Sequence, residues 1–286
     1  MAMLNAWRGG LLSLHERSIM QFFVLVGAQR FGTTVFRETL ATNPAISVRG
    51  EVFNPVDGED EFGRYTREQN FGRPLNYLDA ERQLRSYLGH LRDDLGPGVK
   101  VFGIDVKYGQ LRSIAPYHEA LCAVPTLVQF IRKSGCRVLH VVRDNVLHAS
   151  LSEAIATARH VWHHKTNTAL PTKFTIDCQQ LIRSMQEKRA DRAIFASLME
   201  GQARMITCEY ERTVRGLGMT DADGLLTGDG NPLFEVADFL GVPREFRRPG
   251  TLHKVVQTPY HEIIANYDQV RKTVGRTEFA TLLDTI

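Results

Sequence analysis

Residues 21–34 read QFFVLVGAQRFGTT, an apolar run that leads into a loop bounded by glycines. Residues 22–26 are rich in β-formers, which predicts a buried strand, and the apolar spacing after Gly32 predicts a helix through Leu40. Gly27 and Gly32 have the spacing of the GxxxxGK[ST] phosphate loop, where backbone N–H groups and a helix N-terminus enclose an anion. The order strand, loop, helix predicts such an anion site; a tight connection without a ligand is the alternative.

The usual lysine of that loop is missing. Thr33 stands in its place, Thr34 follows, and the positive charge lies inside the loop at Arg30. A nucleoside triphosphate held with magnesium needs the lysine on its β and γ phosphates. A donor with one phosphate joined to a sulfate can instead be held by amides, hydroxyls and a single cation. The loop therefore favours an anionic nucleotide other than ATP.

The composition is that of an ordinary soluble protein, with 286 residues, 43% of them hydrophobic and 23% charged. We expect a single domain over residues 1–286, with residues 1–19 as an N-terminal extension. The formal net charge of +3 is too small to indicate nucleic-acid binding, but it suits a cleft that attracts small anions. No apolar run reaches membrane-spanning length and the N-terminus lacks a secretory signal, so we expect neither a membrane span nor export.

The cysteines are scattered along the chain, without a CxxC pair or a histidine at metal-ligand spacing. They are Cys122, Cys136, Cys178 and Cys208. This pattern predicts reduced thiols in a cytoplasmic protein.

Strand-like and helix-like segments alternate, which predicts an α/β fold: a parallel five-stranded sheet with helices on both faces, a three-layer sandwich like that of phosphate-loop NTPases. After residues 22–26, further strands are expected early in 45–55 and at 101–107, 137–142 and 204–208. Helices are expected around residues 84–91, at 120–133, from near Asn145, from an Asp177 cap to about Glu200, and at 234–240. Residues 57–76 and 221–231 are expected to be irregular loops.

Ligands of doubly wound sheets bind beyond the carboxyl ends of the strands, so the residues that follow each strand deserve inspection. The first strand supplies Arg30 and its neighbours, and the next three supply Glu51, Lys107 and Arg143. Cations and amides that hold a donor, with a carboxylate that deprotonates an acceptor, suit the transfer of an anionic group. The alternatives are a solvated loop carboxylate at Glu51, an exposed lysine at position 107, and a strand-end arginine at position 143 that pairs with Asp144 or Glu153.

These residues resemble the sulfotransferases that use 3′-phosphoadenosine 5′-phosphosulfate (PAPS), and most of all the bacterial carbohydrate enzymes of the trehalose and nodulation-factor type. The family loop RSGTT, which holds the 5′-phosphosulfate, is similar to residues 30–34, RFGTT, with Phe31 in place of serine. The family's second signature, an arginine and a later serine that bind the 3′-phosphate, is similar to residues 141–152, VVRDNVLHASLS. Arg143 is the arginine; the serine is Ser152 by the family's spacing, with Ser150 as the competing register.

Weaker matches follow in the family's order. They are residues 50–55 (GEVFNP, family GExF), 103–107 (GIDVK, family GFK), 209–211 (EYE, family YEdL), 239–242, 254–259 and 264–267. Asp105 departs from the family by adding a carboxylate to the third strand.

The resemblance implies direct in-line transfer of the sulfuryl group from PAPS to an acceptor hydroxyl, without a metal. It makes Glu51 the base and Arg30 the cation that stabilises the leaving group. The donor would be bound by Gln29, Arg30, Phe31, Gly32, Thr33, Thr34, Arg143, Ser152 and Lys254. Relatives often dimerise, so a homodimer is possible.

The acceptor is expected to be a carbohydrate or glycolipid hydroxyl. A phenol, a lipid alcohol and a polyketide are the alternative acceptors. Residues 57–76, 160–173 and 221–231 are expected to form the acceptor side, with Trp162 and Lys107 as candidate contacts. Residues 160–164, HVWHH, lack the carboxylate pattern of HExxH, which argues against a metal site.

Two other classes share the loop. A phosphate-loop kinase or NTPase is expected to have a lysine at position 33 and an acidic magnesium ligand at a strand end, a role for which Asp105 is a poor candidate. A non-catalytic nucleotide-binding protein would keep the loop without the base.

Overall fold

The computed structural model describes residues 21–55, 60–69, 79–114, 122–159, 173–201, 204–250 and 258–286. Five described strands form one sheet in which every pairing is parallel, in the order β2-β3-β1-β4-β5. They are β1 (Gln21–Gly27), β2 (Ile46–Arg49), β3 (Val101–Lys107), β4 (Arg137–Val142) and β5 (Arg204–Glu209). The five-stranded parallel sheet predicted from the sequence is confirmed.

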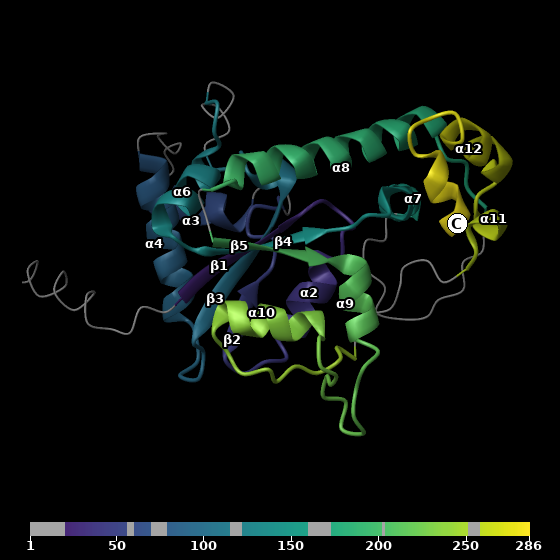
Figure 1. Ribbon diagram of the computed structural model, residues 1–286. Helices are drawn as coiled ribbons and strands as arrows, with labels where there is room; N and C mark the ends of the chain where they lie inside the picture. Colours follow the sequence, from purple (N-terminus) through teal and green to yellow (C-terminus); the bar gives the residue numbers. More distant parts are fainter. Residues whose placement is uncertain are drawn as a thin grey trace, which may run out of the picture.

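Helices cover both faces of the sheet, which gives the three layers of the expected sandwich (Figure 1). On one face lie α4 (Ala80–Asp93), α6 (Thr126–Ser134), α7 (Val146–Arg159) and α8 (Cys178–Met199). On the other face lie α2 (Thr33–Leu40), α9 (Tyr210–Gly216) and α10 (Pro232–Leu240). The short η2 (Tyr108–Gln110) directly follows β3, and α3 (Glu61–Gln69) packs beside α4.

The apolar run of β1 explains its central position. Phe23, Val24, Leu25 and Val26 are fully buried, and β1 pairs with β3 on one side and with β4 on the other. A strand that is covered on both faces reads as a continuous hydrophobic run. The chain leaves β1 over one face of the sheet and returns from β3 to β4 over the other, so the carboxyl end of β1 lies at the crevice where ligands bind.

Residues 61–69 are helical, which corrects the expectation of an irregular loop over 57–76. The helix α3 buries Phe62 and Thr66, and the ring of Phe62 contacts that of Tyr87 on α4 with centroids 5.4 Å apart. Its other residues are mainly polar and include a glycine, so the sequence pattern does not indicate a helix here. Residues 57–59 and 70–76 lie outside the described part of the chain.

The helix expected at 120–133 begins at Thr126, and residues 122–125 are not helical. Pro125 precedes the first turn, since a proline inside a helix would remove a hydrogen bond and clash with the preceding turn. The helix expected from Asp177 is confirmed as α8, where the Asp177 carboxylate accepts hydrogen bonds from the N–H groups of Gln179 and Gln180.

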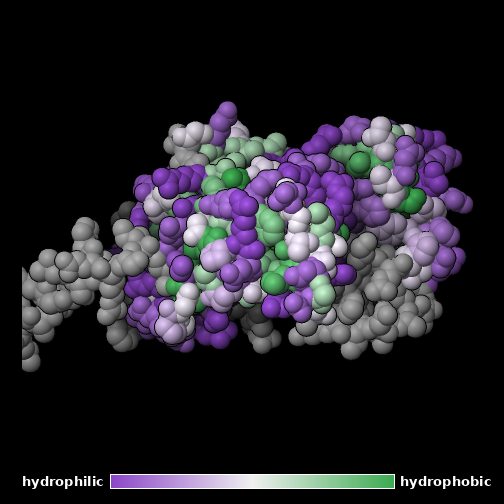
Figure 2. All heavy atoms as spheres, turned by 60° about the horizontal axis from the view of Figure 1, so that its bottom comes forward, coloured by the Kyte–Doolittle hydropathy of each residue, from purple (hydrophilic) through white to green (hydrophobic). Residues whose placement is uncertain are grey.

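The C-terminal segment comprises α11 (Tyr260–Ile263), α12 (Tyr267–Val274) and η3 (Ala280–Thr285). In Figure 1 these yellow elements lie beyond one end of α8, on the side toward which β4 points. Within the described ranges, no helix is both long and apolar enough to cross a membrane. The face seen in Figure 2 is mostly hydrophilic, with hydrophobic residues in small groups between polar ones.

Candidate active site

The loop after β1 uses two left-handed residues to pass directly into α2. Arg30 has a φ of 66° and Gly32 a φ of 89°. The Phe31 N–H donates to the Ala28 carbonyl at 3.2 Å, and the Phe36 N–H donates to the Gly32 carbonyl at 3.1 Å. The first N–H groups of α2 have no partner inside the helix and therefore face the loop. This is the geometry of an anion site at a helix N-terminus.

Glycine is required at position 32 for two independent reasons. Its φ lies in the region that side-chain-bearing residues rarely adopt. In addition, a Cβ there would lie 2.2 Å from Cδ2 of Tyr210, the first residue of α9. The ring of Tyr210 therefore closes against the loop backbone.

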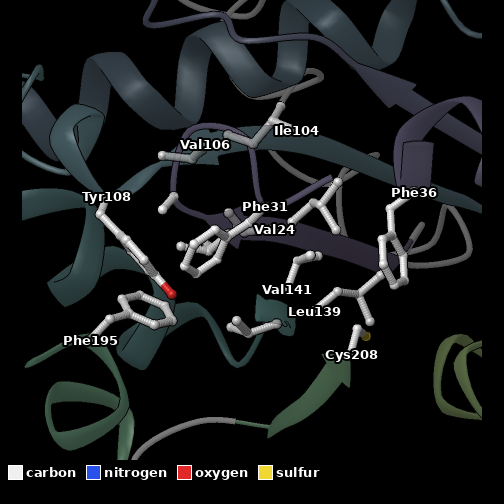
Figure 3. Packing of buried hydrophobic residues seen from close by; sticks show 14 of the residues in the cluster. Val24, Phe31, Phe36, Ile104, Val106, Tyr108, Leu139, Val141, Phe195 and Cys208 are labelled. Atoms are coloured by element: carbon white, nitrogen blue, oxygen red, sulfur yellow. The ribbon is translucent and has the colours of Figure 1, made fainter. Parts of the chain in front are cut away.

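The Phe31 side chain points into the core and is unavailable to a ligand. It is fully buried, and its ring meets that of Tyr108 edge-on with centroids 6.4 Å apart. Figure 3 shows Phe31 among buried side chains beside Tyr108 and Phe195. The departure from the family's serine thus serves packing, and Phe31 adds only backbone to the site.

The side chain of Arg30 reaches α7 instead of Glu51. Its Nε and Nη2 donate to Ser152 Oγ at 3.1 and 3.0 Å. Arg143, which follows β4, donates from Nη1 to the Arg30 carbonyl at 3.0 Å. Burial lowers the pKa of Arg30, and the nearby charge of Arg143 lowers it further. Two cations this close repel each other, and a bound anion would relieve that repulsion.

Arg143 contacts an aromatic and an acidic side chain of α9. Its guanidinium lies 4.4 Å from the ring centroid of Tyr210, and its Nε lies 3.8 Å from Glu211 Oε1. Asp144 and Glu153, the partners that an ordinary strand-end arginine would use, pair with basic residues of α8. Within the described chain, the buried Nε of Arg143 has no hydrogen-bond acceptor. A buried donor without an acceptor is uncommon in folded proteins.

The two candidate serines face different parts of the protein. Ser152 accepts from Arg30, whereas Ser150 is 1% exposed and its Oγ accepts from Ser184 of α8 at 3.1 Å. Positions two apart on a helix point in nearly opposite directions. The geometry therefore favours Ser152 as the serine of the loop side.

Lys107 occupies the other side of the loop and is nearly fully buried. Its Nζ donates to Thr33 Oγ1 at 2.6 Å and to Asp105 Oδ1 at 2.7 Å, and it lies 3.1 Å from Glu51 Oε1. Lys107 is 4% exposed, so the alternative of an exposed strand-end lysine is wrong. The ammonium thus lies beside the residue at which the ordinary phosphate loop carries its own lysine.

Glu51 is oriented by neutral donors as well as by Lys107. Gln110 of η2 donates to Glu51 Oε2 at 3.1 Å, and Gln29 of the loop donates to the same oxygen at 3.4 Å. The Glu51 side chain keeps 17% of its surface exposed. It is therefore a fixed carboxylate that solvent can still reach.

Three other residues were predicted from the sequence to belong to the site. Thr34 is half-buried in the first turn of α2. Lys254 and Trp162 lie outside the described residues. Over the part of the chain that the structure covers, no group of three or more histidine, cysteine or acidic side chains could hold a metal.

Two site residues were missed from the sequence. Gln110 lies in the turn after β3, beyond Lys107, and nothing in its pattern distinguishes it. Tyr210 directly follows β5, so the strand-end argument, had it been extended to the fifth strand, would have found it.

Neither a family model nor a curated protein matches the chain. A comparison with solved structures finds two sulfotransferases among the matches. Sulfotransferase STF9 from Mycobacterium avium has a TM-score of 0.43 at 12% identity, over 99% of this chain and 81% of that one. Mouse sulfotransferase SULT7A1, complexed with PAP, has a TM-score of 0.39 at 10% identity, over 93% of this chain and 89% of that one.

Proposed function

We propose that this protein is a sulfotransferase that moves the sulfuryl group of PAPS to an acceptor hydroxyl. One observation carries the proposal, namely that different charges lie on the two sides of the loop after β1. A cationic cluster of two arginines and a serine lies on one side, and a carboxylate paired with an ammonium lies on the other. The cluster consists of Arg30, Arg143 and Ser152, and the pair consists of Glu51 and Lys107. A donor with phosphate at one end and a reacting group at the other fits such a division.

The cationic cluster would hold the phosphate groups of the donor. Arg143 and Ser152 suit the 3′-phosphate, because a planar guanidinium and a hydroxyl donate to adjacent phosphate oxygens. Arg30 already contacts Ser152, which places a second guanidinium at the same anion. The N–H groups at the start of α2, with the hydroxyl of Thr34, would hold the 5′-phosphosulfate.

Transfer would then occur by in-line displacement at sulfur. Glu51 takes the proton of the acceptor hydroxyl, and the acceptor oxygen forms a bond to sulfur. The bond from sulfur to the bridging oxygen breaks, and its electron pair stays on the leaving 5′-phosphate of adenosine 3′,5′-bisphosphate (PAP). Lys107, which lies beside both Thr33 and Glu51, supplies positive charge where negative charge builds up.

The same contacts argue against a phosphate-loop kinase. Such an enzyme needs an acidic magnesium ligand at a strand end. The carboxylate of β3, Asp105, is fully buried and bonded to Lys107. A sulfuryl group carries less charge than a phosphoryl group, so the proposed transfer needs no metal. Following the family resemblance, we assign a carbohydrate or glycolipid hydroxyl as the acceptor.

Substitution of Glu51 tests the proposed base. Glu51→Gln keeps the size of the side chain but cannot take a proton, so the turnover number should fall by about 10²–10⁴-fold. PAP binding should change by less than about threefold, because the phosphate contacts lie on the other side of the loop. Transfer from radiolabelled PAPS to a panel of sugars, glycolipids and phenols gives the turnover, and calorimetry gives the binding.

Glu61→Gln is the matched control, since Glu61 on α3 pairs with Arg49 at the surface. This variant should behave as the unmodified protein does. An unchanged turnover number in Glu51→Gln would remove Glu51 from the base role. Absence of PAP binding by the unmodified protein would refute the proposed function itself.

A further inference from the structure

Asp105 is a buried carboxylate for which the proposed chemistry has so far given no role. It lies on β3 between β2 and β1 and is 0% exposed. Positions two apart on a strand share one face of the sheet, so Asp105 lies beside Lys107. Asp105 Oδ1 accepts from Lys107 Nζ at 2.7 Å, and Oδ2 has no hydrogen-bond donor among the described residues.

Stability does not explain a charge in this position. Removing two charges from water costs about as much as their attraction returns, and apolar replacements of buried ion pairs are often neutral or stabilising. Perturbed buried charges cluster at functional sites for that reason. The pair of Asp105 and Lys107 adjoins the candidate base, which suggests where its function lies.

The Lys107 ammonium has three protons and three acceptors around it. They are Thr33 Oγ1 at 2.6 Å, Asp105 Oδ1 at 2.7 Å and Glu51 Oε1 at 3.1 Å. The ammonium is therefore fixed in orientation, and of the two carboxylates it lies nearer to Asp105. If Asp105 were neutral, the whole charge of Lys107 would act on Glu51 and would make Glu51 a poorer proton acceptor.

Among the described residues, few other charges face this group. From α2, Arg37 Nη1 lies 3.9 Å from Asp105 Oδ2. Within the ranges that the structure describes, the remaining polar contacts of Glu51 are the neutral amides of Gln29 and Gln110. The balance between Asp105, Lys107 and Glu51 is thus the main electrostatic control on the base.

We propose that Asp105 is a positioning residue that takes up part of the Lys107 charge and so keeps Glu51 basic while the ammonium stays beside Thr33. This inference rests on the proposed function, since it assigns the tuning of the same base. Burial raises the pKa of Asp105 and the ammonium of Lys107 opposes that rise, so the two charges depend on each other.

The test measures the release of sulfate from radiolabelled PAPS in a single turnover, with water as the acceptor, between about pH 3.5 and about pH 8, which covers the range where carboxylates titrate. Asp105→Asn should lower the rate at neutral pH about three- to tenfold, and it should move the acidic limb of the profile about one unit lower. PAP affinity should change by less than about threefold. Asp177→Asn, at the start of α8, is the control for loss of a carboxylate and should change none of these values.

A second comparison tests the proposal even if the single variant Asp105→Asn folds poorly. If Asp105 acts through Lys107, adding Asp105→Asn to Lys107→Met should change the rate by less than about twofold. A merely structural role would instead lower the amount of folded protein without moving the limb.

The inference is overturned if the limb stays in place in Asp105→Asn, or if the two substitutions act independently. It falls together with the proposed function if the unmodified protein neither binds PAP nor releases sulfate.

Discussion

Removing the Lys107 ammonium should make the stability of this protein depend on pH in an unusual direction. Lys107→Met leaves the fully buried Asp105 without this ion pair, and the nearest remaining cation among the described residues is Arg37, 3.9 Å away. Removal of one partner from a buried ion pair costs about 3–5 kcal/mol when the other charge stays. The free energy of unfolding at neutral pH should fall by that amount.

The cost should disappear in acid, because Asp105 can escape it by taking up a proton. Burial raises the pKa of Asp105 above its unfolded value, and without Lys107 nothing of comparable strength opposes the rise. The folded variant therefore holds a proton that the unfolded chain has released. The stability that this proton contributes is fully present below the unfolded Asp pKa of about 3.9. It is lost, by about 1.4 kcal/mol per pH unit, as the pH rises toward the pKa of Asp105 in the folded protein.

Urea unfolding followed by circular dichroism between about pH 4.5 and about pH 7.5 measures this difference from the unmodified protein. In Asp105→Asn/Lys107→Met, which removes both charges, the difference should be small and independent of pH. A deficit in Lys107→Met that stays constant over this range would refute the account of the buried pair. So would a double variant that is no more stable than Lys107→Met at neutral pH.

Two further predictions concern the core and the phosphate side. Burial, with a smaller contribution from the Arg192 charge, lowers the pKa of His140 to about 4, so the unfolded chain binds a proton more readily than the folded protein does. Stability should fall by about 3 kcal/mol as the pH drops from about 6.5 to about 4, and His140→Gln should remove that share of the slope in thermal unfolding. Ser152→Ala should weaken PAP binding about 10–150-fold by calorimetry, since a hydrogen bond to a charged group contributes about 1.5–3 kcal/mol, while Ser150→Ala should leave it unchanged. The opposite ranking of the two serines would assign the 3′-phosphate to Ser150.

The sheet was predictable because its signals are local. The β3 and β4 bounds agree with the sequence-based prediction, since both strands are short apolar runs between turn residues. Asp177 marked the start of α8 because its carboxylate caps the helix, and the left-handed Gly241 that follows α10 is the usual residue at a helix end. The helix α3 was missed because only Phe62 and Thr66 are buried in a polar segment.

The residues that lie together at the carboxyl end of the sheet were predictable, and their pairings were less so. Strand ends identified Arg30, Glu51, Lys107 and Arg143, because parallel strands bring their carboxyl ends together. The sequence could not show that Arg30 reaches Ser152, 122 positions away, while Lys107 lies beside Glu51. Side-chain direction depends on backbone angles such as the left-handed φ of Arg30, which local pattern does not specify.

The central claim is that the loop without a lysine binds a nucleotide by its 3′-phosphate, and thermal unfolding with three nucleotides tests it most directly. At about 100 times its dissociation constant, PAP should stabilise the protein by about 2.7 kcal/mol, or roughly 5 °C. Adenosine 5′-phosphate lacks the group that Arg143 and Ser152 would hold. At the same concentration it should therefore give almost no shift, as should ATP with magnesium. Stabilisation by ATP with magnesium and none by PAP would contradict the account.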